Sequence, residues 1–285
     1  MHYVIGDVHG CYDELITLVN KIENKDKDAR FIFVGDWVDR GQKVYDTLLW
    51  MRDHITENGK YQSVLGNHDI DALDWWNNQY LPFREKNPDI EGKKIPITMY
   101  DFSDVVAKDF QHDIKAIQSV MDTYSRMEFN KVVDVITANG SKVRYRIVHG
   151  WYDSRRASDS DEQYETNIWG REHISSRGYS NGDEILIHGH TPTASYDYMM
   201  NSDMNTHRPG LIGYRPNCIN VDGGCCYFKD FPQYLCMLCA ICLETLEEIY
   251  PYTLKERVIQ SGVIECVPVY DKTDKNRKDM ENRIC

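Results

Sequence analysis

Polar residues that can bind metal ions follow five short apolar segments of this chain. The segments 3–5, 31–34 and 63–65 are each followed by carboxylate, imidazole or amide side chains, and the segments 143–148 and 184–187 lead to histidines. The polar residues are Asp7, His9, Asp36, Asn67, His149 and His190. Because ligands collect at the carboxyl ends of strands in an open α/β sheet, we expect these side chains to meet at one place.

Mixed oxygen and nitrogen ligands suit divalent cations of intermediate softness. Two such cations that share a bridging carboxylate can hold a hydroxide between them, lower its pKa and neutralise phosphoryl oxygens during an in-line displacement. Asp36 is the natural bridge, with Asp7 and His9 completing one metal site. The second metal site would then comprise Asn67, His149 and His190. We favour manganese, although iron, zinc and nickel also suit these ligands.

The spacing of apolar residues predicts the elements that position these groups. Residues 11–23 carry Leu15, Leu18, Val19 and Ile22, the i, i+3, i+4, i+7 pattern of a helix with one buried face. Residues 43–57 repeat that pattern and stop at an Asn-Gly pair. Two βαβ units are therefore complete within about seventy residues, which implies parallel strands joined by right-handed crossovers.

The pattern changes between residues 71 and 142, which we interpret as a helical insertion beside the site. Trp75, Trp76 and Tyr80 precede a loop, and a long amphipathic helix follows over 106–124. The three aromatic residues could stack on a nucleobase, but a buried aromatic core is favoured because such rings bury much surface.

The sheet pattern resumes with strands expected over 142–148, 184–187, 218–221 and 234–243. We predict a catalytic domain over residues 1–252 that includes the insertion. Residues 253–285 are polar and highly charged, and we expect a tail that is disordered or loosely docked.

The composition excludes some function classes. The 285 residues include 45 Asp and Glu against 33 Lys and Arg, a formal net charge of −12, so we expect no broad nucleic-acid binding. The nine cysteines are scattered and favour buried thiols over a disulfide framework. Cys236, Cys239 and Cys242 have iron–sulfur-like spacing, but residues three apart on a strand point to opposite faces and would not converge on one metal.

We expect no signal peptide, because no charged region followed by an apolar run comes before the first strand, and no apolar run reaches membrane-spanning length. We therefore expect a cytoplasmic enzyme with no membrane partner. The sequence does not indicate an oligomeric state.

Five motifs together resemble one protein family. They are Gly-Asp-x-His-Gly at 6–10, Gly-Asp-x-Val-Asp-Arg-Gly at 35–41, Gly-Asn-His-Asp at 66–69, His-Gly at 149–150 and Gly-His-Thr-Pro at 189–192. This set resembles the phosphoprotein-phosphatase branch of the calcineurin-like metallophosphoesterases, in particular lambda-type Ser/Thr phosphatases and symmetrical dinucleoside tetraphosphatases. The resemblance implies an α/β fold with a central β-sandwich flanked by helices.

The resemblance also implies roles for individual residues. It implies the metal ligands named above, and it makes His68 the general acid, oriented by Asp39. Arg40, Arg171 and Asn67 would bind the substrate phosphate. Imidazole suits proton transfer near neutral pH, and guanidinium forks match phosphate geometry, so residue chemistry agrees.

His188 and His190 compete for one ligand position. Both follow the strand 184–187, and the family pattern favours the histidine before Thr191, which is His190. His188 would then support a ligand through a hydrogen bond, and Asp222 could play a similar part.

The chain departs from the family pattern at several points. Gln42 stands where relatives usually have proline, and Asp69 stands where many have glutamate. The insertion 71–142 has no counterpart that would indicate a substrate. Substrate choice therefore stays open although the reaction class does not.

These observations predict a dinuclear metal-dependent phosphomonoester hydrolase, with a protein Ser/Thr phosphatase as the leading hypothesis. A bridging hydroxide would attack phosphorus directly while His68 protonates the leaving group. The alternative is a dinucleoside polyphosphate hydrolase, or a nucleotide or nucleic-acid phosphodiesterase, that uses the same site. A more remote alternative is an inactive metal-binding scaffold. The expected partner is a phosphorylated protein or a small phosphoester.

Overall fold

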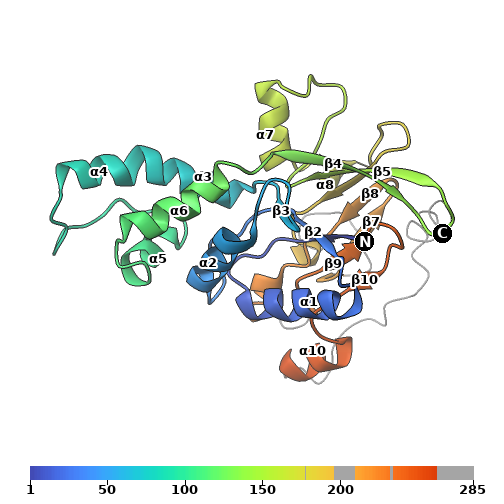
Figure 1. Ribbon diagram of the computed structural model, residues 1–285, viewed down its shortest axis with the longest axis horizontal. Coiled ribbons are helices and arrows are strands. Elements are labelled where there is room, and N and C mark those ends of the chain that lie inside the picture. Colours follow the sequence, from blue (N-terminus) through green and yellow to red (C-terminus); the bar gives the residue numbers. More distant parts are fainter. Residues whose placement is uncertain (177, 196–208, 232–233, 262–285) are drawn as a thin grey trace.

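A computed structural model describes residues 1–176, 178–195, 209–231 and 234–261 of this chain. Two five-stranded mixed sheets lie at its centre, with helices on their outer sides (Figure 1). The first sheet has the order β10-β9-β1-β2-β3 and the second the order β4-β5-β6-β8-β7. The predicted α/β fold with a central β-sandwich is confirmed.

The first sheet contains the parallel strands that the sequence predicts. Its strands are β1 (His2–Ile5), β2 (Arg30–Phe33), β3 (Tyr61–Ser63), β9 (Ala240–Cys242) and β10 (Glu248–Ile249). β1 and β3 both pair with β2 in parallel, whereas β9 runs antiparallel to β1. Helices α1 (Tyr12–Lys25) and α2 (Val44–His54) connect the parallel strands, as the apolar spacing predicts.

The second sheet supplies the later strand ends. Its strands are β4 (Asn130–Ile136), β5 (Lys142–Val148), β6 (Ile185–His188), β7 (Gly213–Arg215) and β8 (Cys218–Asn220). β6 pairs in parallel with both β5 and β8, while β4 and β7 run antiparallel to their neighbours. Helices α7 (Asp161–Trp169) and α8 (Glu172–Ser175) lie between β5 and β6 in the chain.

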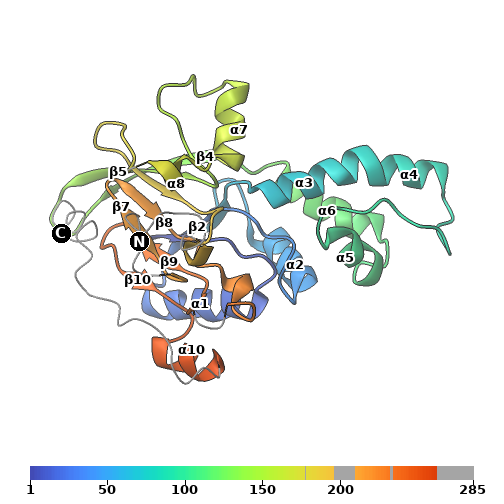
Figure 2. The ribbon, with the colours of Figure 1, turned by 180° about the vertical axis from the view of Figure 1, so that it is seen from behind.

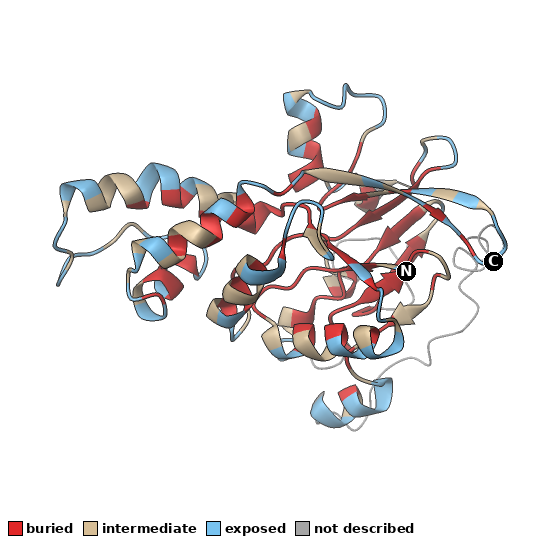
Figure 3. Cartoon of the chain, viewed as in Figure 1, coloured by how far each residue is buried: buried red, intermediate tan, exposed pale blue. Residues whose placement is uncertain are grey.

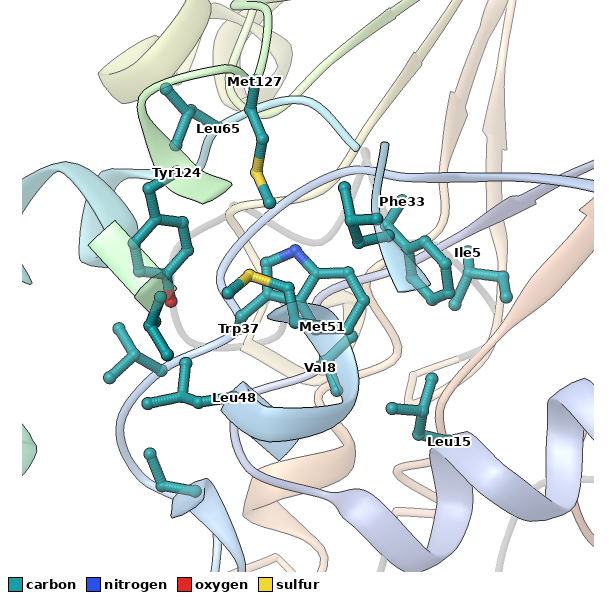
Figure 4. Packing of buried hydrophobic residues seen from close by; sticks show 14 of the residues in the cluster. Ile5, Val8, Leu15, Phe33, Trp37, Leu48, Met51, Leu65, Tyr124 and Met127 are labelled. Atoms are coloured by element: carbon teal, nitrogen blue, oxygen red, sulfur yellow. The ribbon is translucent and has the colours of Figure 1, made fainter. Parts of the chain in front are cut away.

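Both faces of the first sheet are buried, which explains its continuous apolar strands. Val4 and Ile32 face the second sheet and share a cluster with Ile147 and Ile187. The alternate residues of the same strands point the other way, into a larger cluster beneath α1 and α2. In that cluster Trp37 lies among apolar side chains (Figure 4), and its indole N–H donates to Ser63 Oγ at 3.0 Å.

The insertion extends from the sandwich as a helical arm (Figures 1 and 2). It comprises α3 (Asn67–Trp75), the five-residue π-helix η1 (Trp76–Tyr80), α4 (Leu81–Lys86), α5 (Phe102–Lys108) and α6 (Ile114–Tyr124). The long helix expected over 106–124 is divided between α5 and α6. Gln111 and His112, which lie between the two helices, have φ values of 48° and 60° that a continuous helix does not allow, and the Asp113 side chain caps the second helix.

The structure also shows where the helical part of the insertion ends and how its aromatic residues are packed. The range 71–142 includes β4, whose residues Val132, Val133 and Val135 are β-branched and suit a strand, so the helical part ends at Tyr124. Trp75 and Trp76 are almost fully buried, and Figure 3 shows buried stretches along the helices of the arm. They form an aromatic core and offer no face to a nucleobase.

The last part of the described chain differs from expectation in detail. The strand expected over 234–243 is limited to β9, and β7 and β10, whose residues form no apolar run, were missed. Cys239 and Cys242 belong to clusters on opposite sides of the first sheet, which excludes a shared metal for those two thiols. Within the described residues no helix has the length and apolar character needed to cross a membrane.

The expected polar tail begins with a helix, α10 (Leu254–Ser261). Arg257 of α10 is buried and pairs with Glu14 of α1 at 2.6 Å. This ion pair docks the first eight or so residues of that segment on the domain. Residues 262–285 lie outside the described residues.

Candidate active site

The predicted ligands converge where the strands of both sheets end. Residues following β1, β2 and β3 bring Asp7, His9, Asp36 and Asn67 together, and residues following β5 and β6 bring His149 and His190 to the same place. All six are buried. Five residues of the predicted site have left-handed backbone conformations, which are costly for side chains other than glycine and cluster at functional sites. These are His9, Asp36, Asp39, Arg40 and His190.

Asp36 lies between two histidines that come from different sheets. Its Oδ2 is 3.2 Å from His9 Nε2 and 3.4 Å from His149 Nε2, while its Oδ1 accepts a hydrogen bond from the His68 backbone N–H at 3.0 Å. One carboxylate therefore faces both halves of the site, which is the arrangement that a bridging ligand needs.

The two histidines are held in the tautomer of a metal ligand. His9 Nδ1 donates to the carbonyl oxygen of Val38, and His149 Nδ1 donates to that of Val34, both at 2.8 Å. A hydrogen bond at Nδ1 leaves the lone pair on Nε2, the atom that faces Asp36 in each case.

The second half of the site contains the amide and the remaining histidine. Asn67 Oδ1 is 3.0 Å from His149 Nε2 and 2.8 Å from His190 Nδ1. His190 Nε2 and Asp7 Oδ1 are buried and, within the described part of the chain, have no hydrogen-bond partner. Asp7 Oδ2 is fixed by the His190 backbone N–H at 3.0 Å. Unpaired buried donors and acceptors of this kind are expected at a cation site.

Two glycines let the carboxylates approach the backbone. A Cβ atom on Gly66 would lie 2.1 Å from Asp36 Oδ1, and one on Gly189 would lie 2.0 Å from Asp7 Oδ1. Any side chain at these positions would push a predicted ligand out of place. The glycines of the Gly-Asn-His-Asp and Gly-His-Thr-Pro motifs therefore have a steric role.

The charges at the site favour a cation. Burial, followed by repulsion from Asp222, raises the pKa of Asp7 well above its usual range. Burial lowers the pKa of His190 to about 2, which keeps this imidazole neutral and its lone pairs available. Burial opposes protonation of His149, but Asp36 and Asp7 outweigh it and raise the pKa of His149 to about 9. A divalent cation would displace that proton and offset the buried carboxylates.

The residues available to hold cations form two overlapping triples. His9, Asp36 and His68 make one, and Asp36, His149 and His190 make the other; in each triple the ligand atoms lie within 4.8 Å of one another. Asp36 belongs to both, as a bridge would. His68 replaces the predicted Asp7 in the first triple, so the assignment of Asp7 as a ligand stays a prediction.

His68, the predicted general acid, has charged neighbours on both ring nitrogens. Its Nδ1 is 2.7 Å from Asp39 Oδ2, and its Nε2 is 2.8 Å from a terminal nitrogen of Arg40. The other terminal nitrogen of Arg40 is 3.0 Å from His9 Nε2. Asp39 thus fixes the orientation of His68, and Arg40 joins His9 and His68 through its two terminal nitrogens.

The remaining predicted residues lie at the edge of this centre. Arg171 is exposed and donates to Thr191 Oγ1 at 2.6 Å, one residue beyond His190. His188 packs against the ring of His173 at 4.4 Å and lies outside both triples. Asp222 Oδ1 accepts a hydrogen bond from the Gly224 backbone N–H at 2.8 Å.

The structure adds residues that sequence reasoning missed. The Asp69 carboxylate accepts hydrogen bonds from the backbone N–H groups of Asp36, Trp37 and Gly66 at 2.9 to 3.0 Å, so it supports the loop that carries the bridge. Its place three residues after Gly66 is the capping-box spacing, a signal that was available. Tyr100 and Asp101 of the insertion also contact the centre, and no spacing pattern marks them.

Two mixed sheets with two candidate cation sites at their strand ends are an arrangement that suits a metal-dependent hydrolase. Residues 3–209 match the sequence model of the calcineurin-like phosphoesterase family, and this chain belongs to that family. Calcineurin-like phosphoesterases generally depend on two metal ions, and the two triples supply candidate residues for them.

Relatives with known names match only part of this chain. A symmetrical bis(5'-nucleosyl)-tetraphosphatase of Escherichia coli is 44% identical over 72 residues, which are 25% of this chain and 24% of that enzyme. The chain therefore matches about a quarter of the length of this relative.

Two solved structures share the fold over most of their length. A putative diadenosine tetraphosphatase has a TM-score of 0.51 and 16% identity, covering 87% of this chain and 91% of its own. A cold-active protein-tyrosine phosphatase of a psychrophilic Shewanella species has a TM-score of 0.50 and 15% identity, covering 87% and 76%. At these identities the similarity concerns the fold alone.

Proposed function

We propose that this chain is a dinuclear metal-dependent phosphomonoester hydrolase. The observation that carries the proposal is the position of Asp36, which faces His9 and His149 and anchors the backbone of His68. Two divalent cations held by the predicted ligands would activate water and neutralise charge on the phosphoryl oxygens. Manganese is the metal we propose to test first.

Side chains of the protein would then transfer one proton to the leaving group and bind the charged phosphate. Asp39 accepts from His68 Nδ1 and stabilises the protonated imidazole, which can give its Nε2 proton to the departing oxygen. That nitrogen now faces Arg40, so the guanidinium must turn away from His68 when substrate binds. A phosphate group supplies the new partner, because guanidinium forks pair well with phosphoryl oxygens.

The leading substrate class remains a phosphorylated protein. The Gly-Asp-x-Val-Asp-Arg-Gly motif carries both Asp39 and Arg40, the acid's orienting carboxylate and the proposed phosphate clamp. Arg171 and Asn67 complete the proposed phosphate contacts. Attack by water, without a covalent phosphoenzyme, is the reaction we propose.

A dinucleoside polyphosphate is the second candidate. A symmetrical bis(5'-nucleosyl)-tetraphosphatase is 44% identical to this chain over 72 residues. Trp169 is 42% exposed and its ring is 6.3 Å from that of His190, so it offers a face on which a nucleobase could stack. This candidate no longer involves Trp75 or Trp76, which are buried.

A substitution at His68 tests the mechanism. His68→Asn is expected to lower kcat by about a hundredfold to ten-thousandfold on an alkyl phosphate, the usual contribution of a general acid, with metal content unchanged. Full activity would refute the acid role. Loss of bound metal would instead assign His68 to the cation site, in agreement with the triple that includes it.

Steady-state rates on enzyme stripped of metal and reloaded with manganese would separate the substrate classes. The substrates are a phosphopeptide, p-nitrophenyl phosphate, a dinucleoside tetraphosphate and a phosphodiester. A preference for the phosphopeptide supports the leading candidate, and a large preference for the dinucleotide or the diester supports the second. No turnover on any of them with two metals bound would leave only the inactive scaffold.

A further inference from the structure

One loop of the insertion reaches the proposed general acid. The ring of Tyr100 lies 4.2 Å from the ring of His68, with an angle of 37° between the two planes. The guanidinium of Arg40 lies 5.5 Å from the same Tyr100 ring. Tyr100 therefore touches both side chains that the proposed reaction places around the leaving group.

The next residue along the chain anchors this loop to the catalytic motif. The Asp101 backbone N–H donates to Asp39 Oδ1 at 3.1 Å, and the Asp101 carboxylate accepts from the Arg40 backbone N–H at 3.0 Å. Thr98 Oγ1 also donates to the Tyr100 carbonyl oxygen at 2.8 Å. These hydrogen bonds fix the position of the Tyr100 ring relative to His68.

Tyr100 also has a free face. His68 is 1% exposed, whereas Tyr100 is 37% exposed, so part of the Tyr100 ring can be covered by another molecule. Ile97 and Met99 of the same loop are 80% and 84% exposed. The loop that carries Tyr100 thus exposes further apolar side chains to solvent.

We propose that Tyr100 determines leaving-group specificity and favours aryl phosphate monoesters, of which phosphotyrosine is the protein example, over alkyl ones. The proposal rests on the proposed function, because it places the leaving oxygen at His68 Nε2. A group bonded to that oxygen lies within about one ring width of Tyr100. A phenyl ring there can pack against Tyr100 in an offset or edge-to-face arrangement, whereas the Cβ of a serine is too small to do so.

The chemical step is the same for both substrate types. The oxygen of water bonds to phosphorus, and the bond from phosphorus to the leaving oxygen breaks with its electron pair on that oxygen. His68 gives that oxygen a proton, and water's spare proton returns to solvent, so an aryl ester yields phosphate and a phenol. Only the group attached to the leaving oxygen differs, and that group is what Tyr100 would contact.

The test compares two peptides of one sequence that carry either phosphotyrosine or phosphoserine. We expect Tyr100→Ala and Tyr100→Leu to lower the ratio of kcat/KM for phosphotyrosine over phosphoserine by about three- to tenfold, the usual effect of one aromatic pair. Tyr100→Phe keeps the ring and should keep the wild-type ratio. Ile259→Ala, at an exposed position on α10, is the control for a surface substitution.

The possible outcomes distinguish a failure of this inference from a failure of the proposed hydrolase function. An unchanged ratio in Tyr100→Ala, with both rates reduced equally, would overturn the inference and leave Tyr100 as a support for His68. A wild-type preference for the dinucleoside tetraphosphate that Tyr100→Ala reduces would also overturn it, in favour of base stacking. No phosphate release from either peptide or from p-nitrophenyl phosphate by the metal-loaded wild type would refute the hydrolase itself.

Discussion

The sandwich and the helical arm contribute to the candidate site in different ways. The strand ends of the sandwich supply five of the six predicted ligands, and Asn67, the first residue of α3, supplies the sixth; all six are buried. The arm contributes the loop containing Tyr100 and Asp101, whose side chains are partly or largely exposed. The comparison suggests a division of labour, in which the sandwich sets the chemistry and the arm influences which substrates reach it.

The two regions also differ in how firmly the chain holds their residues. The ligand loops combine left-handed backbone conformations with hydrogen bonds to buried carboxylates, such as the one that the Asp36 backbone N–H donates to Asp69. The loop at Tyr100 is joined to the sandwich by the hydrogen bonds of Asp101 and by one ring contact. A region held by fewer contacts can change with less cost to the fold, which suits a part that selects substrates.

The largest effect is expected when the bridge of the sandwich is removed. Asp36→Asn should lower kcat/KM by at least about a thousandfold, because several kcal/mol of charge stabilisation depend on both cations. Metal analysis should find both ions lost. Asp104→Asn, on an exposed face of α5 in the arm, is the matched control and should change neither quantity. Retention of one full metal equivalent in Asp36→Asn would contradict its role as a bridge.

A substitution inside the arm should affect stability instead of metal binding. Trp76 is fully buried, stacks on Tyr80 and donates to Gln118 Oε1 at 2.9 Å. Trp76→Ala should destabilise the protein by about 3 kcal/mol, the usual cost of removing a large buried ring. Denaturant titration gives the free energy of unfolding, and Ile136→Ala, exposed on β4, is the control.

The same Trp76 variant also tests the division of labour. Metal content should stay at the wild-type level while the aryl preference assigned to Tyr100 declines. If Trp76→Ala loses its metals at temperatures where the sandwich stays folded, the arm supports the cation site directly and the proposed division is wrong.

The convergence of the six predicted ligands could be predicted from the sequence because its determinants are local. Each ligand follows an apolar strand within a few residues, and parallel strands bring those ends together whatever lies between them. The family motif favoured His190 over His188 as a ligand. The structure packs His188 against His173 and brings His190 to Asp36, and the role of His190 as a ligand stays a prediction.

The arm was less predictable because its contacts are not local. Tyr100 meets His68, more than thirty residues earlier, from a loop without periodic spacing. The expected long helix is divided by a turn in which Gln111 and His112 have positive φ values, and neither residue type indicates such a conformation in the sequence. β4 was assigned to the insertion because its pairing with β5 is visible only in the folded sheet.

The smallest effect that we expect is a loss of unfolding free energy at low pH, caused by a histidine outside the arm. His173 is fully buried, and burial, followed by the charges of His188 and His190, holds its pKa well below the usual value. The pKa of histidine in the unfolded chain is near 6.5. As the pH falls below that value, the unfolded chain binds a proton that the folded protein does not, and the free energy of unfolding decreases. At pH 6 this amounts to about 0.8 kcal/mol for one histidine, and it grows at lower pH.

His173→Phe should therefore reduce the loss of unfolding free energy between pH 7 and pH 5.5, measured by denaturant titration at each pH. The arm offers a matched control in His112, whose pKa is lowered by burial and then by Arg84 but which is partly exposed and bonded to the Tyr80 hydroxyl at 2.9 Å. His112→Phe should change the pH dependence less, because solvent screens a partly exposed group. If both substitutions changed the pH dependence of the unfolding free energy equally, the difference in burial between the two histidines would not explain the effect of acid.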